Sequence, residues 1–384
     1  MMISFEFATA NRIIFGAGKL TELSKQIERN TKRLLLVSGH SSDAIPRLRE
    51  TLSALGIPVT EFQVHGEPTV DMIREGIKVA RDCDTVIGLG GGSVLDTGKA
   101  IAALVTNPGD LFAYLEVIGK GQPLINTPLP YIAIPTTAGT GSEVTRNAVI
   151  EAPEQNVKVS LRSPLMLPGI ALVDPELTYN LPPEITASSG MDALAQLIEP
   201  FVSIRANPMT DAICREGISR AARSLRRAYE NGGDKEARGG MALAGLFGGL
   251  ALANAALGVV HGFAGPLGGM LHAPHGALCA RLLPLAMEAN IKALETRQPE
   301  NPALNRYIEI AQMLTDEKDA TAWDGVKWTR ELVGTLKIPQ LSAYGMSKEH
   351  FPEAVEKTMK ANSFKGNPIV LNEGELIEIL ERAL

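Results

Sequence analysis

The first half of this 384-residue chain alternates short aliphatic runs with segments of helical spacing, and this alternation limits the folds that the chain can adopt. The predicted order is strand 33–38, helix 45–55, strand 59–64, helix 70–82, strand 85–89, helix 93–105 and strand 131–134. Strands separated by helices need crossover connections, which favour a parallel sheet covered on both faces. Such sheets bind ligands at the carboxyl ends of their strands.

The second half has a different pattern, because strand-like runs nearly vanish after residues 174–178. Predicted helices take their place at 183–202, 210–229, 236–261, 276–290, 305–315, 322–336, 351–362 and 373–384. A chain of this length usually forms two domains, each with its own core. We therefore predict an α/β domain over residues 1–178 and an all-α domain over residues 179–384.

The composition of the chain argues against nucleic-acid-binding, membrane and secreted proteins. The net charge of −6 and the isoelectric point near 5.7 predict no nucleic-acid partner and no anionic membrane surface. Three scattered cysteines indicate reduced thiols, and the first residues lack a signal-peptide pattern, so we expect a cytoplasmic protein. Residues 241–260 form an apolar run long enough to span a membrane, but its Ala and Gly content favours a buried core helix.

Two glycine-rich loops follow predicted strands. Residues 90–93 (Gly-Gly-Gly-Ser) open a helix, where glycines let the backbone approach a pyrophosphate and the helix N-terminus provides free N–H groups. Residues 135–143 repeat this arrangement after the next strand and add threonine hydroxyl groups. The first loop does not match G-x-G-x-x-G, and alone it is equally compatible with a tight strand–helix turn. Two such loops at one sheet edge favour a nucleotide site.

A possible metal site is carried by two segments about seventy residues apart. Asp192 and Gln196 are four residues apart, so on a helix they share one face. Residues 265–269 are rich in Gly and Pro and are predicted to break the helix that contains the second segment. A carboxylate and imidazoles from separate helices can bind a divalent metal. Three of the six histidines lie in the second segment, at His261, His272 and His275.

The same blocks, taken in order, resemble the iron-containing (group III) alcohol dehydrogenase family. The matching blocks are Phe15–Gly18, Gly90–Asp96, Pro135–Thr145, Lys158 with Ser163-Pro164, Asp174-Pro175, Gly190–Leu194, Pro266–Gly269 and Pro274–Gly276. The resemblance implies a Rossmann-like N-terminal domain and an all-α C-terminal domain, with a nicotinamide cofactor and a metal in the cleft between them. It also implies a homodimer that oxidises small alcohols or reduces aldehydes and ketones.

The resemblance also assigns residues by position. The implied metal ligands are Asp192, the residue at 196 (here Gln196), His261 and His275, with Fe(II) or Zn(II) as the metal. The implied NAD(P) contacts are Gly39, Gly90, Gly91, Gly92, Ser93, Asp96, Thr136, Thr137, Thr140, Lys158 and Leu177. We assign catalytic roles to His261, as a ligand, and to His272, as a route for the proton.

Two positions depart from the pattern of the family. The family usually has histidine at Gln196, and a second histidine, thought to help relay the proton, at Gly265. An amide oxygen at 196 is a harder and weaker donor, which makes Fe(II) or Mn(II) less disfavoured against Zn(II). His272 or the ribose hydroxyls can replace the proton path at 265. We expect Glu199, on the same helical face as Asp192, beside the ligands rather than among them.

A third departure concerns the cofactor. Many family members have aspartate at Gly39, which accepts the ribose 2′-hydroxyl and repels a 2′-phosphate. Glycine removes this repulsion, so we hypothesise that NADP(H) is accepted and preferred. The alternative is that Gly39 serves a tight turn and that both cofactors are used. Candidate phosphate contacts are Arg33, His40, Ser41, Ser42 and Arg47.

Other functions are compatible with these residues. Related folds include glycerol dehydrogenases, maleylacetate reductases and dehydroquinate synthases, and the synthases use NAD without net redox change. The threonine-rich loop at 135–143 favours the alcohol dehydrogenases. Gln196 and Gly265 also allow a metal-free or catalytically impaired nucleotide-binding protein, although Asp192, His261 and His275 are all present.

Overall fold

The computed structural model describes residues 4–39, 44–155 and 157–384, and its contacts divide the chain into two compact units. One unit runs from Thr9 to Asn180, and the other consists of Leu181–Leu384 with the segment that ends at Ala8. Ala8 joins the second unit through Asn254, whose side-chain amide pairs with the Ala8 N–H at 2.7 Å and its carbonyl at 3.0 Å. The segment before Thr9 therefore packs with the helices, whereas the sequence placed it in the α/β domain.

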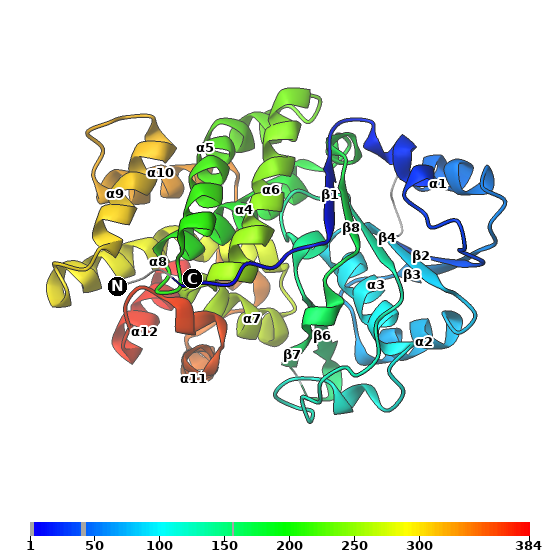
Figure 1. Cartoon of the computed structure of the whole chain (residues 1–384). Helices are drawn as coiled ribbons and strands as arrows, with labels where there is room; N and C mark the ends of the chain where they lie inside the picture. The colour runs from blue at the N-terminus through cyan, green and yellow to red at the C-terminus, as the bar shows by residue number, and fades with distance from the viewer. Residues whose placement is uncertain (1–3, 40–43, 156) are drawn as a thin grey trace. The chain divides into compact units, whose positions relative to one another are not determined.

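The first unit contains a six-stranded sheet in which every neighbouring pair of strands is parallel. Its order is β1-β8-β5-β4-β2-β3 (Figure 1). The strands are Arg12–Phe15 (β1), Leu34–Gly39 (β2), Val59–Val64 (β3), Thr85–Gly90 (β4), Tyr131–Pro135 (β5) and Ile170–Val173 (β8). The four predicted strands are β2 to β5, each correct to within one residue. β1 and β8, which are only four residues long, were not predicted.

Both faces of this sheet are buried, because successive side chains in a strand point to opposite sides. Leu34 and Leu36 of β2 pack with the 3₁₀ helix η1 and with α1 on one face. Leu35 and Val37 pack on the other face, in the cluster to which α2 and α3 contribute. The helices are Lys19–Lys25 (η1), Ala44–Ser53 (α1), Val70–Val79 (α2) and Gly92–Leu104 (α3). The predicted parallel sheet with helices on both faces is confirmed.

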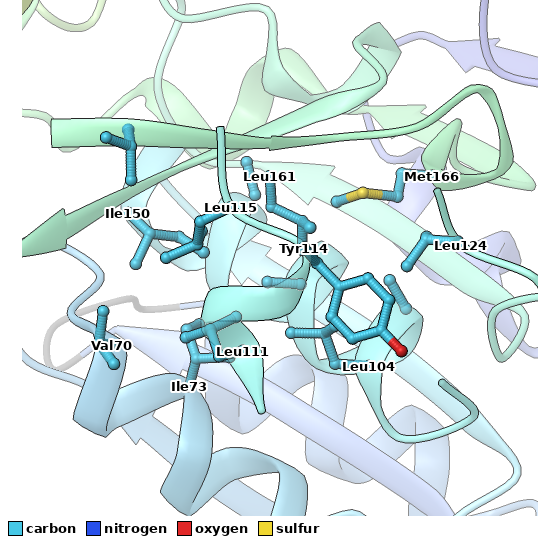
Figure 2. Packing of buried hydrophobic residues seen from close by; sticks show 14 of the residues in the cluster. Val70, Ile73, Leu104, Leu111, Tyr114, Leu115, Leu124, Ile150, Leu161 and Met166 are labelled. Carbon is cyan, nitrogen blue, oxygen red and sulfur yellow. The ribbon is translucent and has the colours of Figure 1, made fainter. Parts of the chain in front are cut away.

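An antiparallel hairpin lies outside the six-stranded sheet and consists of β6 (Asn147–Ala152) and β7 (Val157–Arg162). Figure 2 shows the apolar cluster in which Ile150 and Leu161 of the hairpin gather with Leu111 and with side chains from α2 and α3. This hairpin was not predicted, although the burial of alternate residues along β6 is typical of a strand with one face exposed. It covers part of α3, the helix that begins at the first glycine loop.

The strand order brings two loops together at the carboxyl edge of the sheet. From β2 the chain runs to β3 on one side and then crosses to β4 on the other, so the order reverses between β2 and β4. Open α/β sheets bind ligands at such a reversal. The register pairs Ser38 with Leu89, and Gly90 with Pro135. The carboxyl ends of β2, β4 and β5 therefore lie side by side, and the loops after β4 and β5 start next to each other.

The second unit forms helices and no strand among its described residues. Its α-helices are Pro183–Val202 (α4), Pro208–Glu230 (α5), Lys235–Ala255 (α6), Val259–Leu271 (α7), His275–Arg297 (α8), Ala303–Thr315 (α9), Ala322–Thr335 (α10), Phe351–Lys360 (α11) and Glu373–Ala383 (α12). Helices α4, α5 and α6 pack against one another (Figure 1). Gly248 of α6 makes this packing close, since a Cβ there would lie 3.2 Å from the Ala193 carbonyl oxygen and from Gln196 Cβ.

One predicted helix and one predicted break are wrong. The predicted helix 236–261 is divided at Ala256, which has a φ of 61°, so that α6 ends and α7 begins at Val259. The Gly-Pro stretch 265–269 does not break the chain but lies within α7. The break before His275 occurs instead at His272, whose φ of 49° ends α7 in the left-handed conformation.

The apolar run at 241–260 does not form a membrane-length helix. No single helix in the described part of the chain is long and apolar enough to cross a membrane. Helices α6 and α7 meet these criteria only when they are taken together, and the chain bends by 100° between them.

Glu288 of α8 connects three helices through its carboxylate. It accepts hydrogen bonds from Arg382 of α12 at 2.6 and 2.7 Å and from Arg330 of α10. Lys292 lies 2.8 Å from the same carboxylate. The hydrogen bonds from Arg382, with those of Lys292, lower the pKa of Glu288 to about 2 although burial opposes ionisation.

We predict that Glu288→Gln lowers the free energy of unfolding by about 2 kcal/mol at neutral pH, because the folded state loses its paired carboxylate. The folded-state pKa lies below the usual value, so this stability is present above pH 4.5 and is lost as the pH falls towards 2. The difference from the unmodified protein should shrink over that interval. Urea denaturation at several pH values measures it.

Glu378→Gln is the matched control. Glu378 lies near Lys292 and Arg382 at 3.4 and 3.6 Å, but its side chain is half exposed. Its replacement should cost less than about 0.5 kcal/mol. Equal losses from the two substitutions would show that Glu288 has no special role in joining α8, α10 and α12.

Candidate functional site

Four side chains of the helical unit form a cluster that can bind a metal ion. They are Asp192 on α4, His261 on α7, and His275 and Cys279 on α8. One donor atom from each lies within 4.8 Å of the others. Helix α8 docks closely on α4 at this point, since a Cβ at Gly276 would lie 2.5 Å from the Ser188 carbonyl oxygen. The structure thus brings together three of the four predicted metal ligands.

The carboxylate of Asp192 is buried and faces the imidazoles. Its Oδ1 atom lies 3.3 Å from His261 Nε2 and 3.8 Å from His275 Nε2, yet it accepts no hydrogen bond. Burial opposes ionisation of this carboxyl, but the neighbouring imidazoles outweigh it and lower the pKa of Asp192. A buried carboxylate oxygen without a hydrogen bond is costly. A bound cation would remove that cost, so these residues fit a metal.

Glu199 sets the orientation of His261. Its Oε2 atom lies 2.7 Å from His261 Nδ1, on the side of the ring away from Asp192. Because this carboxylate accepts the Nδ1 proton, the His261 Nε2 lone pair is directed into the cluster, as in the carboxylate–histidine pairs of metal sites. Glu199 is therefore placed beside the cluster rather than within it.

Both histidines of the cluster bind protons strongly when no cation competes. Burial opposes protonation of His261, but Cys279 and the carboxylates of Asp192 and Glu199 outweigh burial and raise its pKa well above the usual value. The pKa of His275 is raised in the same way, by Cys279 and Asp192 against burial. A metal must displace these protons, so metal binding strengthens as the pH rises.

The side-chain amide of Gln196 does not direct its oxygen at the cluster, as a metal ligand would. Its amide nitrogen donates a hydrogen bond to Asp192 Oδ2 at 3.0 Å. Its amide oxygen is buried without a hydrogen-bond partner, and it lies beside Gly248 of α6. The opposite amide orientation would place two oxygen acceptors against each other. The nitrogen of Gln196, and not its oxygen, therefore faces the carboxylate of the cluster.

Two further predicted positions lie near the cluster in sequence. His272 is exposed and ends α7, three residues before His275. Gly265 lies one turn after His261 in α7, and a Cβ built there would meet no atom within 4 Å. The structure therefore has space for a side chain at 265, although this chain carries none.

The first glycine loop forms the N-terminus of α3. Gly91 is the N-cap and provides no side chain to bind the free N–H groups of the first helical turn. A Cβ at Gly92 would lie 2.7 Å from Thr140 Cγ2, so the glycine lets the two predicted loops touch. The Thr136 N–H donates to the Gly90 carbonyl at 3.0 Å. These contacts place Thr136 and Thr140 beside the uncapped helix N-terminus, where an anionic group can bind.

Gly39 ends β2 next to this helix N-terminus. It does not have a positive φ, and a Cβ there would make an ordinary 3.5 Å contact with Val94, so no tight turn requires glycine. Arg33 precedes β2 and lies at the opposite edge of the sheet, so its prediction as a phosphate contact is wrong. Arg47 of α1 pairs with Glu176 at 3.3 Å. His40, Ser41 and Ser42 lie outside the described residues.

Three other predicted cofactor contacts have protein partners. The Asp96 carboxylate accepts hydrogen bonds from Ser142 Oγ and from the Val149 N–H at 2.9 Å, so it ties α3 to β6. Lys158 lies in the hairpin, with its Nζ 3.6 Å from Glu67. Leu177 follows β8 and packs, partly buried, against the apolar cluster beneath α1.

Cys279 was counted only as a scattered thiol in the sequence analysis, although its spacing carried a signal. It follows His275 by four residues, and the predicted helix 276–290 begins directly after His275; residues four apart share one face when a helix includes both. In the structure its Sγ atom lies 3.5 Å from His275 Nε2 and 3.7 Å from His261 Nε2.

Both units are similar to known proteins. A family model described as iron-containing alcohol dehydrogenase matches residues 10–175, and the C-terminal model of that family matches residues 186–384. Alcohol dehydrogenase 4 of Schizosaccharomyces pombe is 36% identical over 379 residues, covering 97% of this chain and 87% of that protein. A 1,3-propanediol dehydrogenase of Citrobacter freundii is 34% identical, covering 99% and 98%.

Solved structures agree with these matches. A crystal structure of a 1,3-propanediol oxidoreductase matches with a TM-score of 0.91 and 33% identity, covering 100% of both chains. The glycine loops and the carboxylate–imidazole cluster lie within the matched segments. The chain therefore belongs to the iron-containing alcohol dehydrogenase family and is an oxidoreductase that acts on CH–OH groups.

Proposed function

We propose that the protein is an NAD(P)-dependent dehydrogenase that oxidises a small alcohol, and reduces the matching aldehyde or ketone, with a divalent metal as Lewis acid. The observation that carries this proposal is the buried Asp192 Oδ1, which accepts no hydrogen bond and faces two imidazoles. When the imidazoles are not protonated, a metal ion would satisfy this buried oxygen. The family match gives the type of reaction.

Asp192, His261 and His275 would hold the metal, which can be Fe(II) or Zn(II). When bound, the metal polarises the substrate oxygen and lowers the pKa of an alcohol. Glu199 keeps His261 in the tautomer that directs Nε2 into the cluster. Gln196 holds the Asp192 carboxylate through Oδ2, so that Oδ1 remains directed into the cluster.

The nucleotide site lies at the carboxyl edge of the sheet. Gly90, Gly91, Gly92 and Ser93 form the end of β4 and the start of α3, where the helix dipole and free N–H groups bind the pyrophosphate. Thr136, Thr137 and Thr140 add hydroxyl donors from the adjoining loop. Asp96 contributes by fixing the position of Ser142 near the end of this loop.

The proposal also includes a route for the proton, a cellular compartment and an oligomeric state. We assign His272 the transfer of the alcohol proton to water, because it is exposed and lies three residues before His275, while Gly265 has no side chain to do so. The three cysteines are buried and free of disulfide bonds, which fits a reducing cytoplasm. A homodimer is proposed from the resemblance to the family.

We predict that Asp192→Asn lowers metal content per chain and lowers kcat/KM for alcohol oxidation at least about 100-fold, because an anionic ligand is lost without a change in volume. Elemental analysis and steady-state cofactor turnover on a panel of small alcohols and aldehydes measure both. Unchanged thermal unfolding would show that the fold is intact. Full activity without metal would contradict the proposal, and activity without net cofactor turnover would indicate synthase chemistry.

NADP(H) preference is also part of the proposal, supported by the absence of a carboxylate at Gly39. We predict that Gly39→Asp raises the ratio of kcat/KM for NADH over NADPH by about tenfold or more, because a carboxylate there repels the 2′-phosphate. The backbone and the 3.5 Å spacing at 39 accept the new side chain. Gly39→Asn, which has the same size without the charge, should change the ratio much less. A strong NADH preference of the unmodified enzyme would contradict the proposal.

A further inference from the structure

The cluster contains a donor that is not predicted from the ligand pattern of the family. Cys279 is buried and lies one helical turn after His275, so both side chains point from α8 toward Asp192 and His261. The Sγ atom of Cys279 lies 3.5 Å from His275 Nε2 and 3.7 Å from His261 Nε2.

Four of the six distances between the donor atoms are close to the edges of one tetrahedral coordination shell, and all six lie within 4.8 Å. With usual zinc bond lengths, tetrahedral geometry separates a sulfur from a nitrogen by about 3.6 Å and a nitrogen from an oxygen by about 3.4 Å. The two sulfur–nitrogen distances are 3.5 and 3.7 Å, and the Asp192 Oδ1 distances to the two imidazoles are 3.3 and 3.8 Å. The buried Asp192 Oδ1, which accepts no hydrogen bond, points independently to a cation here.

Gln196 does not complete this shell. Its amide nitrogen is hydrogen-bonded to Asp192 Oδ2, and its oxygen lies on the side of α6, beside Gly248. To act as a ligand, the amide would have to turn and give up that hydrogen bond. Gln196 therefore acts as a positioning residue for Asp192.

We propose that Cys279, and not Gln196, is the fourth protein ligand, so that Asp192, His261, His275 and Cys279 form a shell that prefers Zn(II) to Fe(II). This inference rests on the proposed metal dependence. The thiol loses its proton to water when it binds the metal. Its soft, anionic sulfur favours Zn(II), and together with Asp192 it balances the double charge of the cation. With these four residues holding the metal, a substrate oxygen would have to bind as a fifth ligand, which zinc sites can accept.

Cobalt(II) tests this assignment directly, since a thiolate bound to Co(II) gives a charge-transfer absorption in the near ultraviolet that oxygen and nitrogen ligands lack. We expect the full-length protein, stripped of metal and loaded with one Co(II) per chain, to show this band. Zn(II) should displace the Co(II) and remove the band. Fe(II) should compete at least about tenfold less well than Zn(II).

Three variants separate the ligand from its neighbours. Cys279→Ser should lose the band and weaken Zn(II) binding at least about tenfold in competition with a chromophoric chelator. Gln196→Leu should keep the band while affinity falls about 10- to 100-fold, as for other residues that support a ligand. Cys214→Ser, which changes another buried cysteine in the helical unit, should change neither. Circular dichroism confirms that each variant is folded.

The results of these experiments separate the Cys279 assignment from the proposed metal dependence. Co(II) bound at one per chain without the band, or a band that survives Cys279→Ser, would overturn the Cys279 assignment and leave the metal-dependent function intact. In that case the thiol only donates a weak hydrogen bond to an imidazole. Loss of Co(II) binding in Gln196→Leu but not in Cys279→Ser would make Gln196 the ligand. No stoichiometric binding of Co(II), Zn(II) or Fe(II) by the unmodified protein would overturn the proposed metal dependence and this inference together.

Discussion

The metal cluster depends on one buried carboxylate, that of Glu199. Its Oε1 accepts the Val260 N–H at 2.6 Å, and its Oε2 contacts the His261 ring at 2.7 Å. The first amides of a helix need partners from outside the helix, and here a negative charge satisfies them and matches the helix dipole. Gly258 makes the approach possible, because a Cβ there would lie 2.8 Å from Glu199 Oε1. The helix start and the direction of the His261 ring are therefore set by the same side chain.

The same constraint explains why the long apolar segment is two helices. A continuous helix through Ala256 would use the amides near Val260 for its own hydrogen bonds, and Glu199 would be buried without donors. The backbone of Ala256, with a φ of 61° and a ψ of −179°, lies in a region that side chains rarely adopt and costs about 1–3 kcal/mol. A buried carboxylate without partners would cost more. The break is therefore the cheaper arrangement once Glu199 of α4 binds the start of α7.

The two departures at the metal cluster form one arrangement in space. Position 196 supports Asp192 by a hydrogen bond, and Cys279 places a sulfur atom next to both imidazoles. Helix α8 carries two donors on one face, and Gly276 lets that face approach α4 closely. From the sequence alone, Gln196 is predicted to be a weak metal ligand. In the fold, Gln196 supports Asp192, and under the assignment proposed above Cys279 takes the place of the missing ligand.

The sequence by itself determined the parallel sheet, the strands β2 to β5, most helices to within a few residues, both glycine loops and the trio Asp192, His261 and His275. These features depend on local periodicity and on residue type, which can be determined from short stretches of the sequence. Only the tertiary structure decided where α7 begins and that Arg33 lies at the opposite sheet edge from Gly39. It also decided which atom of Gln196 faces Asp192, and that Cys279 joins the cluster. Each of these depends on contacts between residues far apart in sequence, whose geometry is set by helix and strand packing and not by any local pattern.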